Sequence, residues 1–278
     1  MLPADNHVHS QWSWDALSGS MERSCEKAVS LGLHSIAFTE HVDLTAWMIP
    51  PADIAAMPAE FRAMARADGR FCPPPFDVAG YAESIERCRC RFRGLRVMSG
   101  VELGEPHWHA DAVTALLSSY EFDRVIGSVH SLADGADSLV ADRAYSSCAA
   151  ADVVRRYLAE VLRLVQSSDA FAVLGHLDYP LRAWPATAGP VTIGQFEVEF
   201  RAVLRALARS GRVLEVNTRR ESSPDLLRWW RDYGGQALCF GSDAHDPAGV
   251  AAGFRAAAAA AEAAGFRAVP GQDFWLRR

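Results

Sequence analysis

The chain has 278 residues, of which 50% are hydrophobic and 22% are charged, and its formal net charge is −6 with a pI near 5.8. This length is enough for one large barrel or two modest domains with a substantial core. The acidic balance, with no uninterrupted Lys/Arg run longer than a pair such as Arg155-Arg156, argues against a nucleic-acid-binding protein.

No segment has the features of a secretory signal or a membrane anchor. The first residues, MLPADNHVHS, lead into an expected strand without a basic segment and an apolar stretch. No run of about 18 or more apolar residues occurs, because the alanine-rich stretch 256–264 is short and carries Glu262. The six cysteines form no C-x-x-C unit, so we expect free thiols and assign none to a metal. These features predict a cytoplasmic protein with no membrane partner.

Short apolar runs typical of β-strands alternate along the chain with amphipathic stretches typical of helices. The expected strands are residues 2–9, 35–38, 96–101, 124–129, 171–174, 213–216 and 236–240. The expected helices are residues 20–31, 77–92, 149–166, 192–209, a stretch from about 224, and 247–264. Seven strand-led units predict a parallel α/β barrel, one unit short of the usual eight. We expect residues 1–278 to form a single barrel domain.

Residues 44–76 interrupt this alternation. They are rich in proline and show no clear period. Long excursions of this kind commonly carry function when they lie near an active site. We therefore expect an insertion that covers the barrel mouth and acts as a substrate lid.

Imidazoles and carboxylates stand at the ends of the expected strands. They are His7, His9, His41, Glu102, His130, His176, Asp243 and His245. The carboxyl ends of barrel strands converge on one mouth, and residues two apart on a strand point to the same side. Mixed imidazole and carboxylate donors suit Zn, Mn or Fe better than Mg or Ca. The number of ligands exceeds what one ion can use, so we expect two to three divalent ions, an arrangement that activates water and holds a transferred phosphoryl group.

These motifs together carry a resemblance to a known family. The set is His7-x-His9, Thr39-Glu40-His41, Gly100-x-Glu102, Ser128-x-His130, Gly175-His176-x-Asp178, Glu215-x-Asn217 and Gly241-Ser242-Asp243-x-His245. It resembles the PHP (polymerase and histidinol phosphatase) family, and within it the monofunctional histidinol-phosphatase branch. The resemblance implies a distorted (β/α)7 TIM-like barrel with a trinuclear metal site.

The resemblance also implies how the ligands divide among the ions. The first ion would be held by His7, His9, Glu102 and Asp243. The second would be held by Glu102, His130 and His176, with Glu102 bridging. The third would be held by Asp15, His41 and His245, where Asp15 replaces the histidine of many relatives. Of these residues we expect Glu102, Asp243 and His245 to be catalytic.

The related amidohydrolase superfamily also begins with an H-x-H motif, but it usually carries a modified lysine at the fourth strand. Here the fourth expected strand ends in His130, and Lys27 is the only lysine in the chain. The residues therefore disfavour that family.

The expected substrate-binding residues follow from the chemistry of phosphate, because the guanidinium of arginine forms paired hydrogen bonds with its oxygens. Arg182 matches the position where the resemblance implies a phosphate-binding arginine. A second arginine is expected after the Glu215-x-Asn217 segment, but Arg219 and Arg220 stand earlier than the usual pattern. Asn217 and His109 complete the expected set of substrate contacts.

The resulting hypothesis is a metal-dependent phosphomonoesterase acting on a small molecule. The resemblance makes L-histidinol phosphate the leading substrate, with L-histidinol and phosphate as products in histidine biosynthesis. The alternatives are a PHP phosphoesterase acting on another small phosphomonoester, a nucleotide or phosphotyrosine, and a metal-binding module without turnover. The sequence does not predict an oligomeric state.

Overall fold

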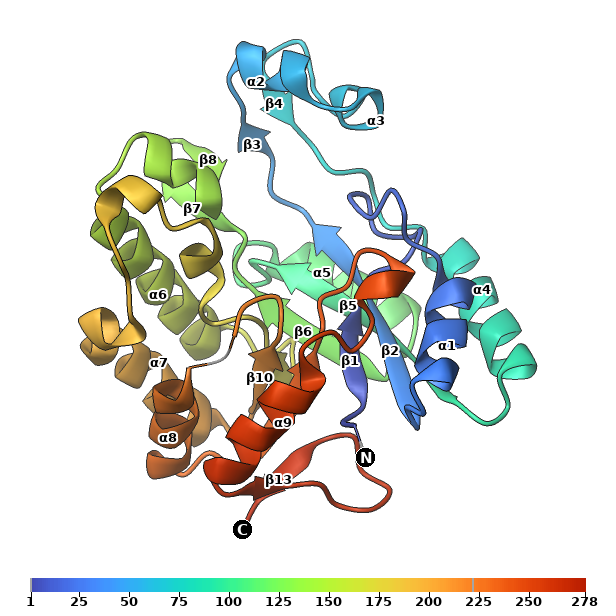
Figure 1. The fold of residues 1–278 in the computed structure, drawn as a ribbon. Helices are drawn as coiled ribbons and strands as arrows, with labels where there is room; N and C mark the ends of the chain where they lie inside the picture. Colours follow the sequence, from blue (N-terminus) through green and yellow to red (C-terminus); the bar gives the residue numbers. More distant parts are fainter. Residues whose placement is uncertain (1, 222) are drawn as a thin grey trace.

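The structure is a computed structural model that describes residues 2–221 and 223–278. Its centre is a run of parallel strands in chain order (Figure 1). They are β1 (Asp5–Val8), β2 (Ser35–Asp43), β5 (Arg96–Gly104), β6 (Arg124–Ser128), β9 (Val173–Leu174), β10 (Val213–Asn217) and β11 (Ala237–Gly241). The first strand meets the segment after the last, because Val8 pairs with Ala244 and the His9 backbone N–H donates to the Ala244 carbonyl at 2.8 Å. The expected seven-stranded α/β barrel is therefore confirmed.

Helices cover the outside of this sheet (Figure 1). They are α1 (Met21–Ser30), α4 (Val78–Arg91), α5 (Ala110–Ser119), α6 (Ala150–Ser167), α7 (Glu197–Ser210), α8 (Pro224–Asp232) and α9 (Phe254–Ala263). The side chain of Asp77 accepts from the Gly80 N–H and caps α4, at the start of the expected helix 77–92. Helix α5 was not predicted, and it has a weak apolar period because Val113 is its only buried residue.

Two of the expected helices are interrupted. The 192–209 stretch begins as the 3-10 helix η4 (Ile193–Phe196) and continues as α7. The 247–264 stretch is divided into the short η5 (Pro247–Gly249) and α9. The division has a backbone cause, because Ala251 and Gly253 adopt φ angles of 55° and 75°, which no α-helix contains.

Several short elements lie outside the expected pattern. Strands β12 (Phe266–Arg267) and β13 (Trp275–Arg277) extend the sheet antiparallel beyond β11. Strands β7 (Ser131–Asp134) and β8 (Asp137–Val140) form a hairpin directly after the metal-ligand candidate at the end of β6. The hairpin is followed by the 3-10 helix η1 (Ala141–Ser146). Two more 3-10 helices, η2 (Tyr179–Ala183) and η3 (Ala186–Ala188), lie in the loop after β9.

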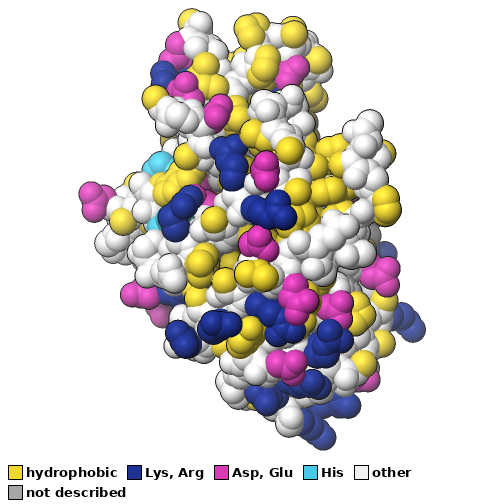
Figure 2. Space-filling view, turned by 90° about the vertical axis from the view of Figure 1, so that its left-hand side faces the viewer, with side chains coloured by type: hydrophobic (Ala, Val, Ile, Leu, Met, Phe, Trp, Pro, Cys, Tyr) yellow, Lys and Arg dark blue, Asp and Glu magenta, His cyan; other side chains and the backbone are white. Residues whose placement is uncertain are grey.

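The 44–76 segment is folded rather than irregular. It contains β3 (Trp47–Met48), α2 (Pro51–Ala56), α3 (Ala59–Arg62) and β4 (Arg70–Phe71). A small apolar cluster of Trp47, Ile49 and Phe71 holds it together. It projects at the top of Figures 1 and 2, and Arg70 ties it to the β7–β8 hairpin through Asp137 at 3.1 Å. Its role as a lid remains a prediction.

The molecular surface carries charges of both signs. On the face shown in Figure 2, basic and acidic side chains are interspersed across the covering helices. Within residues 2–221 and 223–278, no helix combines the length and apolarity needed to cross a bilayer.

Candidate metal centre

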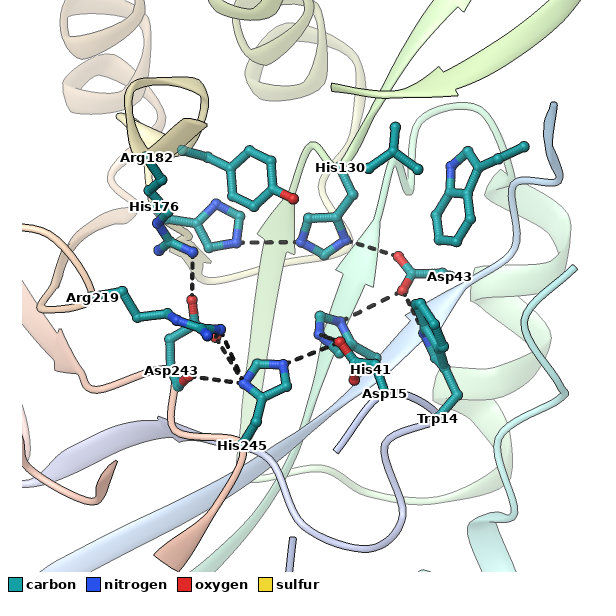
Figure 3. Close-up of a pocket in the computed structure, with 13 residues that line it drawn as sticks. Trp14, Asp15, His41, Asp43, His130, His176, Arg182, Arg219, Asp243 and His245 are labelled. Atoms are coloured by element: carbon teal, nitrogen blue, oxygen red, sulfur yellow. Dashed lines mark hydrogen bonds and ion pairs between the residues drawn. The ribbon is translucent and has the colours of Figure 1, made fainter. Parts of the chain in front are cut away.

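Nine side chains that the sequence singled out as metal ligands meet at the carboxyl end of the barrel, and Figure 3 shows those that line the cavity there. They are His7, His9, Asp15, His41, Glu102, His130, His176, Asp243 and His245. Most belong to a parallel strand or to the residues that directly follow one, and Asp15 lies in the loop after β1. The pleat explains the grouping, because a strand directs residues two apart to the same face.

Glu102 lies at the middle of the group and is fully buried. Its Oε1 is 2.7 Å from His176 Nε2 and 3.3 Å from His130 Nε2. Its Oε2 is 3.0 Å from His7 Nε2 and 3.3 Å from His41 Nδ1. Each carboxylate oxygen thus faces a different pair of imidazoles, which is the arrangement a bridging ligand needs.

Buried hydrogen-bond partners determine which ring nitrogen of His7, His130 and His9 faces the centre of the cluster. His7 Nδ1 lies 2.6 Å from a carboxylate oxygen of Glu215, and His130 Nδ1 lies 2.8 Å from Asp43. Because a carboxylate accepts, each Nδ1 carries a proton, and in the neutral, metal-binding form of the ring Nε2 faces the centre with its lone pair.

His9 is held in the same tautomer by a hydroxyl. Ser13 Oγ donates to Glu40 at 2.5 Å, so its lone pairs accept from His9 Nδ1 at 2.9 Å and from the His41 backbone N–H at 3.0 Å. His9 Nε2 therefore also directs a lone pair inward.

This geometry fits a cation. His7 Nε2 and His9 Nε2 lie 3.1 Å apart, and when both rings are neutral with the proton on Nδ1, both direct a lone pair into this gap. Two facing lone pairs repel, whereas a divalent ion bound to both nitrogens removes the conflict. Among the described residues, buried Nδ1 of His176 and Oδ1 of Asp15 have no hydrogen-bond partner.

Three groups of ligand atoms lie close enough for a shared ion. In each group the atoms are within 4.8 Å of one another. The groups are His7, His9 and Asp243; His41, Glu102 and His130; and His9, His41 and His245. They overlap the predicted sets, with Asp15 Oδ2 adding contacts of 3.4 Å to His41 and 3.2 Å to His245. The residues present therefore suit more than one transition-metal ion.

Burial and neighbouring charged groups set the protonation states within the cluster. Burial raises the pKa of Glu102, but the imidazoles of His7, His130 and His176 outweigh it and hold that pKa well below its ordinary value. Burial, together with the neighbouring imidazoles of His41 and His245, lowers the pKa of His9 well below its ordinary value. An ionised carboxylate beside a neutral imidazole is the protonation state that binds a metal.

Asp243 joins this cluster to the candidate phosphate site. Its φ of 53° is unusual for a residue other than glycine, and such conformations are concentrated at functional sites. Its Oδ1 lies 3.4 Å from His9 Nε2, while its Oδ2 accepts from Arg182 Nη1 at 2.8 Å. Arg182 is held further by Asn217, whose side-chain oxygen accepts from Nη2 at 2.8 Å.

The remaining substrate candidates occupy different places. Arg219 is 46% exposed, and its Nη1 lies 3.2 Å from His245 Nδ1 at the cluster. Arg220 points toward Asp178 at 3.6 Å. His109 contacts the Thr45 hydroxyl at 2.9 Å and does not line the cavity over the cluster.

A cavity of about 150 Å³ opens over the cluster. Besides the metal-ligand candidates, it is lined by Trp14, Asp43, Trp47, Val140, Tyr179, Arg182 and Arg219. A second cavity of about 440 Å³ shares Tyr179, Arg182 and Arg219 with it and adds Arg220 and Asp142. Arginine side chains therefore border both spaces.

The sequence analysis assigned no role to Asp43 and Glu215, although both contact ligand-candidate histidines. In each case the spacing in the sequence could have indicated the contact. Asp43 follows His41 by two residues and Glu215 precedes Asn217 by two, so each shares a strand face with a residue already singled out.

The chain is similar to known proteins over most of its length. The model of the PHP domain family matches residues 5–219. A histidinol-phosphatase of Lactococcus lactis subsp. lactis is 27% identical over 253 residues, covering 88% of this chain and 85% of the relative. A probable histidinol-phosphatase of Deinococcus radiodurans is 28% identical over 268 residues, covering 93% and 91%.

A solved structure extends the likeness to the fold. The histidinol phosphate phosphatase of Lactococcus lactis, complexed with zinc, L-histidinol and phosphate, aligns with a TM-score of 0.76 at 24% identity. The alignment covers 95% of this chain and 94% of that chain. The family match over most of the chain and the shared fold lead to one conclusion: the chain belongs to the PHP domain family.

Proposed function

We propose that the protein is a metal-dependent phosphomonoesterase that hydrolyses L-histidinol phosphate to L-histidinol and phosphate, a reaction of histidine biosynthesis. The observation that carries the proposal is the placement of Arg182 and Arg219 over one cavity with the ligand cluster. Cationic donors beside a multi-ion site suit a phosphoryl group in transfer. The relatives named as histidinol-phosphatases support this choice of substrate.

The metal ligands in this proposal are the sets implied by the family resemblance. His7, His9, Glu102 and Asp243 hold one ion, while Glu102, His130 and His176 hold another. Asp15, His41 and His245 hold a third. Bound divalent ions of zinc, manganese or iron supply Lewis-acid stabilisation of phosphoryl oxygens and make water a nucleophile near neutral pH.

The chain's own residues position the substrate. Burial opposes the charge of Arg182, but Asp243 and Asp178 raise its pKa, so the guanidinium stays protonated. Its Nε is buried and free of any partner among the described residues, so this N–H is available to a phosphoryl oxygen. Asp243 and Asn217 accept from the two terminal nitrogens of the same guanidinium at 2.8 Å each, which fixes its orientation beside the cavity.

Glu102, Asp243 and His245 form the catalytic set in this proposal. Glu102 joins the two imidazole pairs, and Asp243 joins the cluster to Arg182. His245 is partly exposed at the cavity, between Asp15 and Arg219. It is therefore the ligand histidine nearest to incoming substrate.

A second candidate function is hydrolysis of a phosphomonoester that carries a further negative charge, such as phosphotyrosine with its carboxylate or a nucleotide with a second phosphate. The neighbouring cavity of about 440 Å³ favours it, because Arg182, Arg219 and Arg220 all line that space. Histidinol phosphate has no second anionic group to occupy it.

One experiment separates these candidates. The protein is loaded with zinc or manganese, its metal content is measured, and kcat/KM is determined for histidinol phosphate, a nucleoside bisphosphate and tyrosine phosphate. We expect two to three ions and a preference for histidinol phosphate of at least about a hundredfold, which corresponds to about 2.7 kcal/mol. A fully loaded protein that prefers the nucleotide would refute the primary proposal.

A further inference from the structure

The cavity over the metal cluster has two chemically different sides. Arg182 and Arg219 form one side, and an apolar wall of Trp14, Trp47 and Val140 forms the other. Figure 3 shows Trp14 across the group of imidazoles from both arginines. A substrate that fills this space therefore needs an anionic end and an apolar end.

The apolar wall comes from three separate segments of the chain. Trp14 follows β1, Trp47 belongs to β3 in the 44–76 segment, and Val140 ends β8. The two indole rings lie 5.7 Å apart, and Trp47 stacks on Phe71 at 5.9 Å. Trp47 is only 3% exposed, so its ring is held in place by packing.

Both indoles use their polar edges inside the protein. Trp14 Nε1 donates to Asp43 at 2.9 Å, and Trp47 Nε1 donates to Ser131 Oγ at 2.8 Å. With the N–H groups occupied, the wall presents carbon surface to the cavity. Such a surface favours a flat, weakly hydrated ring over a hydrated ammonium or hydroxyl group.

The wall is also fixed relative to the metal cluster. Ser131 Oγ donates to Glu105 at 2.7 Å, and the other oxygen of this buried carboxylate accepts from the His130 and Ser131 backbone N–H groups. Glu105 accepts from the Thr45 hydroxyl at 3.0 Å as well, at the start of the 44–76 segment. One buried carboxylate thus links the segment that carries Trp47 to the ligand His130.

We infer that the wall of Trp14, Trp47 and Val140 is the specificity determinant for the alcohol portion of the substrate, and that it selects phosphomonoesters with a planar ring near the ester. The inference rests on the proposed phosphomonoesterase function. It extends that function by stating which part of the protein recognises the ring and by including ring-bearing esters other than histidinol phosphate.

The test uses three esters that share a 2-amino-alcohol phosphate and differ in one group: histidinol phosphate, phenylalaninol phosphate and alaninol phosphate. Stacking and burial of a ring predict that the metal-loaded protein prefers either ring ester over alaninol phosphate by about ten- to a hundredfold in kcat/KM. In Trp47→Leu this ratio should fall by about tenfold, mainly through KM, whereas Trp47→Phe should retain most of it.

Two further variants sharpen the result. Val140→Phe adds bulk to the wall, so it should lower the ratio by obstructing the ring esters. Trp108→Leu is the matched control, because Trp108 also donates its Nε1, to Glu160 at 2.9 Å, but lies outside the cavity lining. Its ratio should equal that of the wild-type protein.

The outcomes separate this inference from the proposed function. Equal kcat/KM for alaninol phosphate and the ring esters in the wild-type protein would overturn the inference. So would a fall in kcat/KM that is the same for all three esters in Trp47→Leu. A preference for phenylalaninol phosphate over histidinol phosphate would refute the histidinol assignment and still support ring selection. The affinities of the three matching phosphonates, measured by calorimetry, decide the question without turnover: equal affinities overturn it.

Discussion

Glu215 should control metal affinity although it is not itself an expected ligand. One of its oxygens accepts from His7 Nδ1 at 2.6 Å, and the other accepts from the His176 backbone N–H at 2.7 Å. Glu215→Gln keeps the shape but leaves a single acceptor oxygen. The Asn217 side-chain N–H also donates to Glu215, at 3.2 Å, so at least one of three buried donors must then face the new amide N–H, which costs about 1–3 kcal/mol.

The cost should appear in metal binding, because His7 presents its lone pair only while Nδ1–H is held. Loss of such a partner typically lowers metal affinity by about 10- to 100-fold. The assay is competition for zinc between the folded protein and a chelator of known affinity at fixed pH. Glu160→Gln is the matched control, since Glu160 is also buried and contacts a histidine, His107, at 2.7 Å, but lies outside the cluster. Zinc affinity within about twofold of wild type in Glu215→Gln would refute the reasoning.

Three further predictions follow from individual contacts. Glu102→Gln should lower the bound metal below two ions per chain and abolish turnover, measured by elemental analysis and phosphate release; full metal content with full activity would contradict the bridging role. Arg182→Lys should reduce kcat/KM by about 10- to 100-fold with unchanged metal content. The reason is that an ammonium cannot keep the hydrogen bonds to Asp243 and Asn217 and also donate to phosphate. Wild-type kinetics in this variant would count against the phosphate site. Tyr81→Phe should lower the free energy of unfolding by about 1–3 kcal/mol in a urea titration, because the Phe38 carbonyl and the Gly100 N–H lose the hydroxyl they share at 2.7 and 2.6 Å; an unchanged midpoint would contradict this.

The barrel could be predicted because its signal is local and repeated. Each parallel strand is a short buried run, and each run is followed by a polar residue at the mouth. Helix α5 escaped prediction because Val113 is its only fully buried residue, while Leu116 and Leu117 pack beside it half-buried. The break between η5 and α9 escaped for a different reason: Ala251 adopts its positive φ where Asp5 accepts from its backbone N–H at 2.9 Å, a contact across the whole chain.

The metal-ligand candidates could be predicted from the same pattern, since a pleated strand directs alternate residues to one face. The sequence does not indicate which ring nitrogen, Nδ1 or Nε2, each histidine directs toward the metal cluster. That choice depends on partners distant in sequence, such as Glu215 for His7 and Asp43 for His130. Hydrogen bonds over such separations leave no local period, so the structure was needed to find them.

In the proposed function, metal chemistry and substrate choice rest on different parts of this molecule. The metal-ligand candidates stand on the barrel strands or directly after them, where burial and the ladder of backbone hydrogen bonds fix them. The residues that we propose to meet the substrate include several from loops and insertions: Arg219 and Arg220 after β10, Trp47 in the 44–76 segment and Val140 on the β8 edge. Variation in loops changes recognition without moving the strand ends. A substitution in the apolar wall should therefore change the preference for ring esters while the metal content stays constant. Glu105 should be the exception, because it contacts both the ligand candidate His130 and the 44–76 segment, so a substitution there should change metal content and ring preference together.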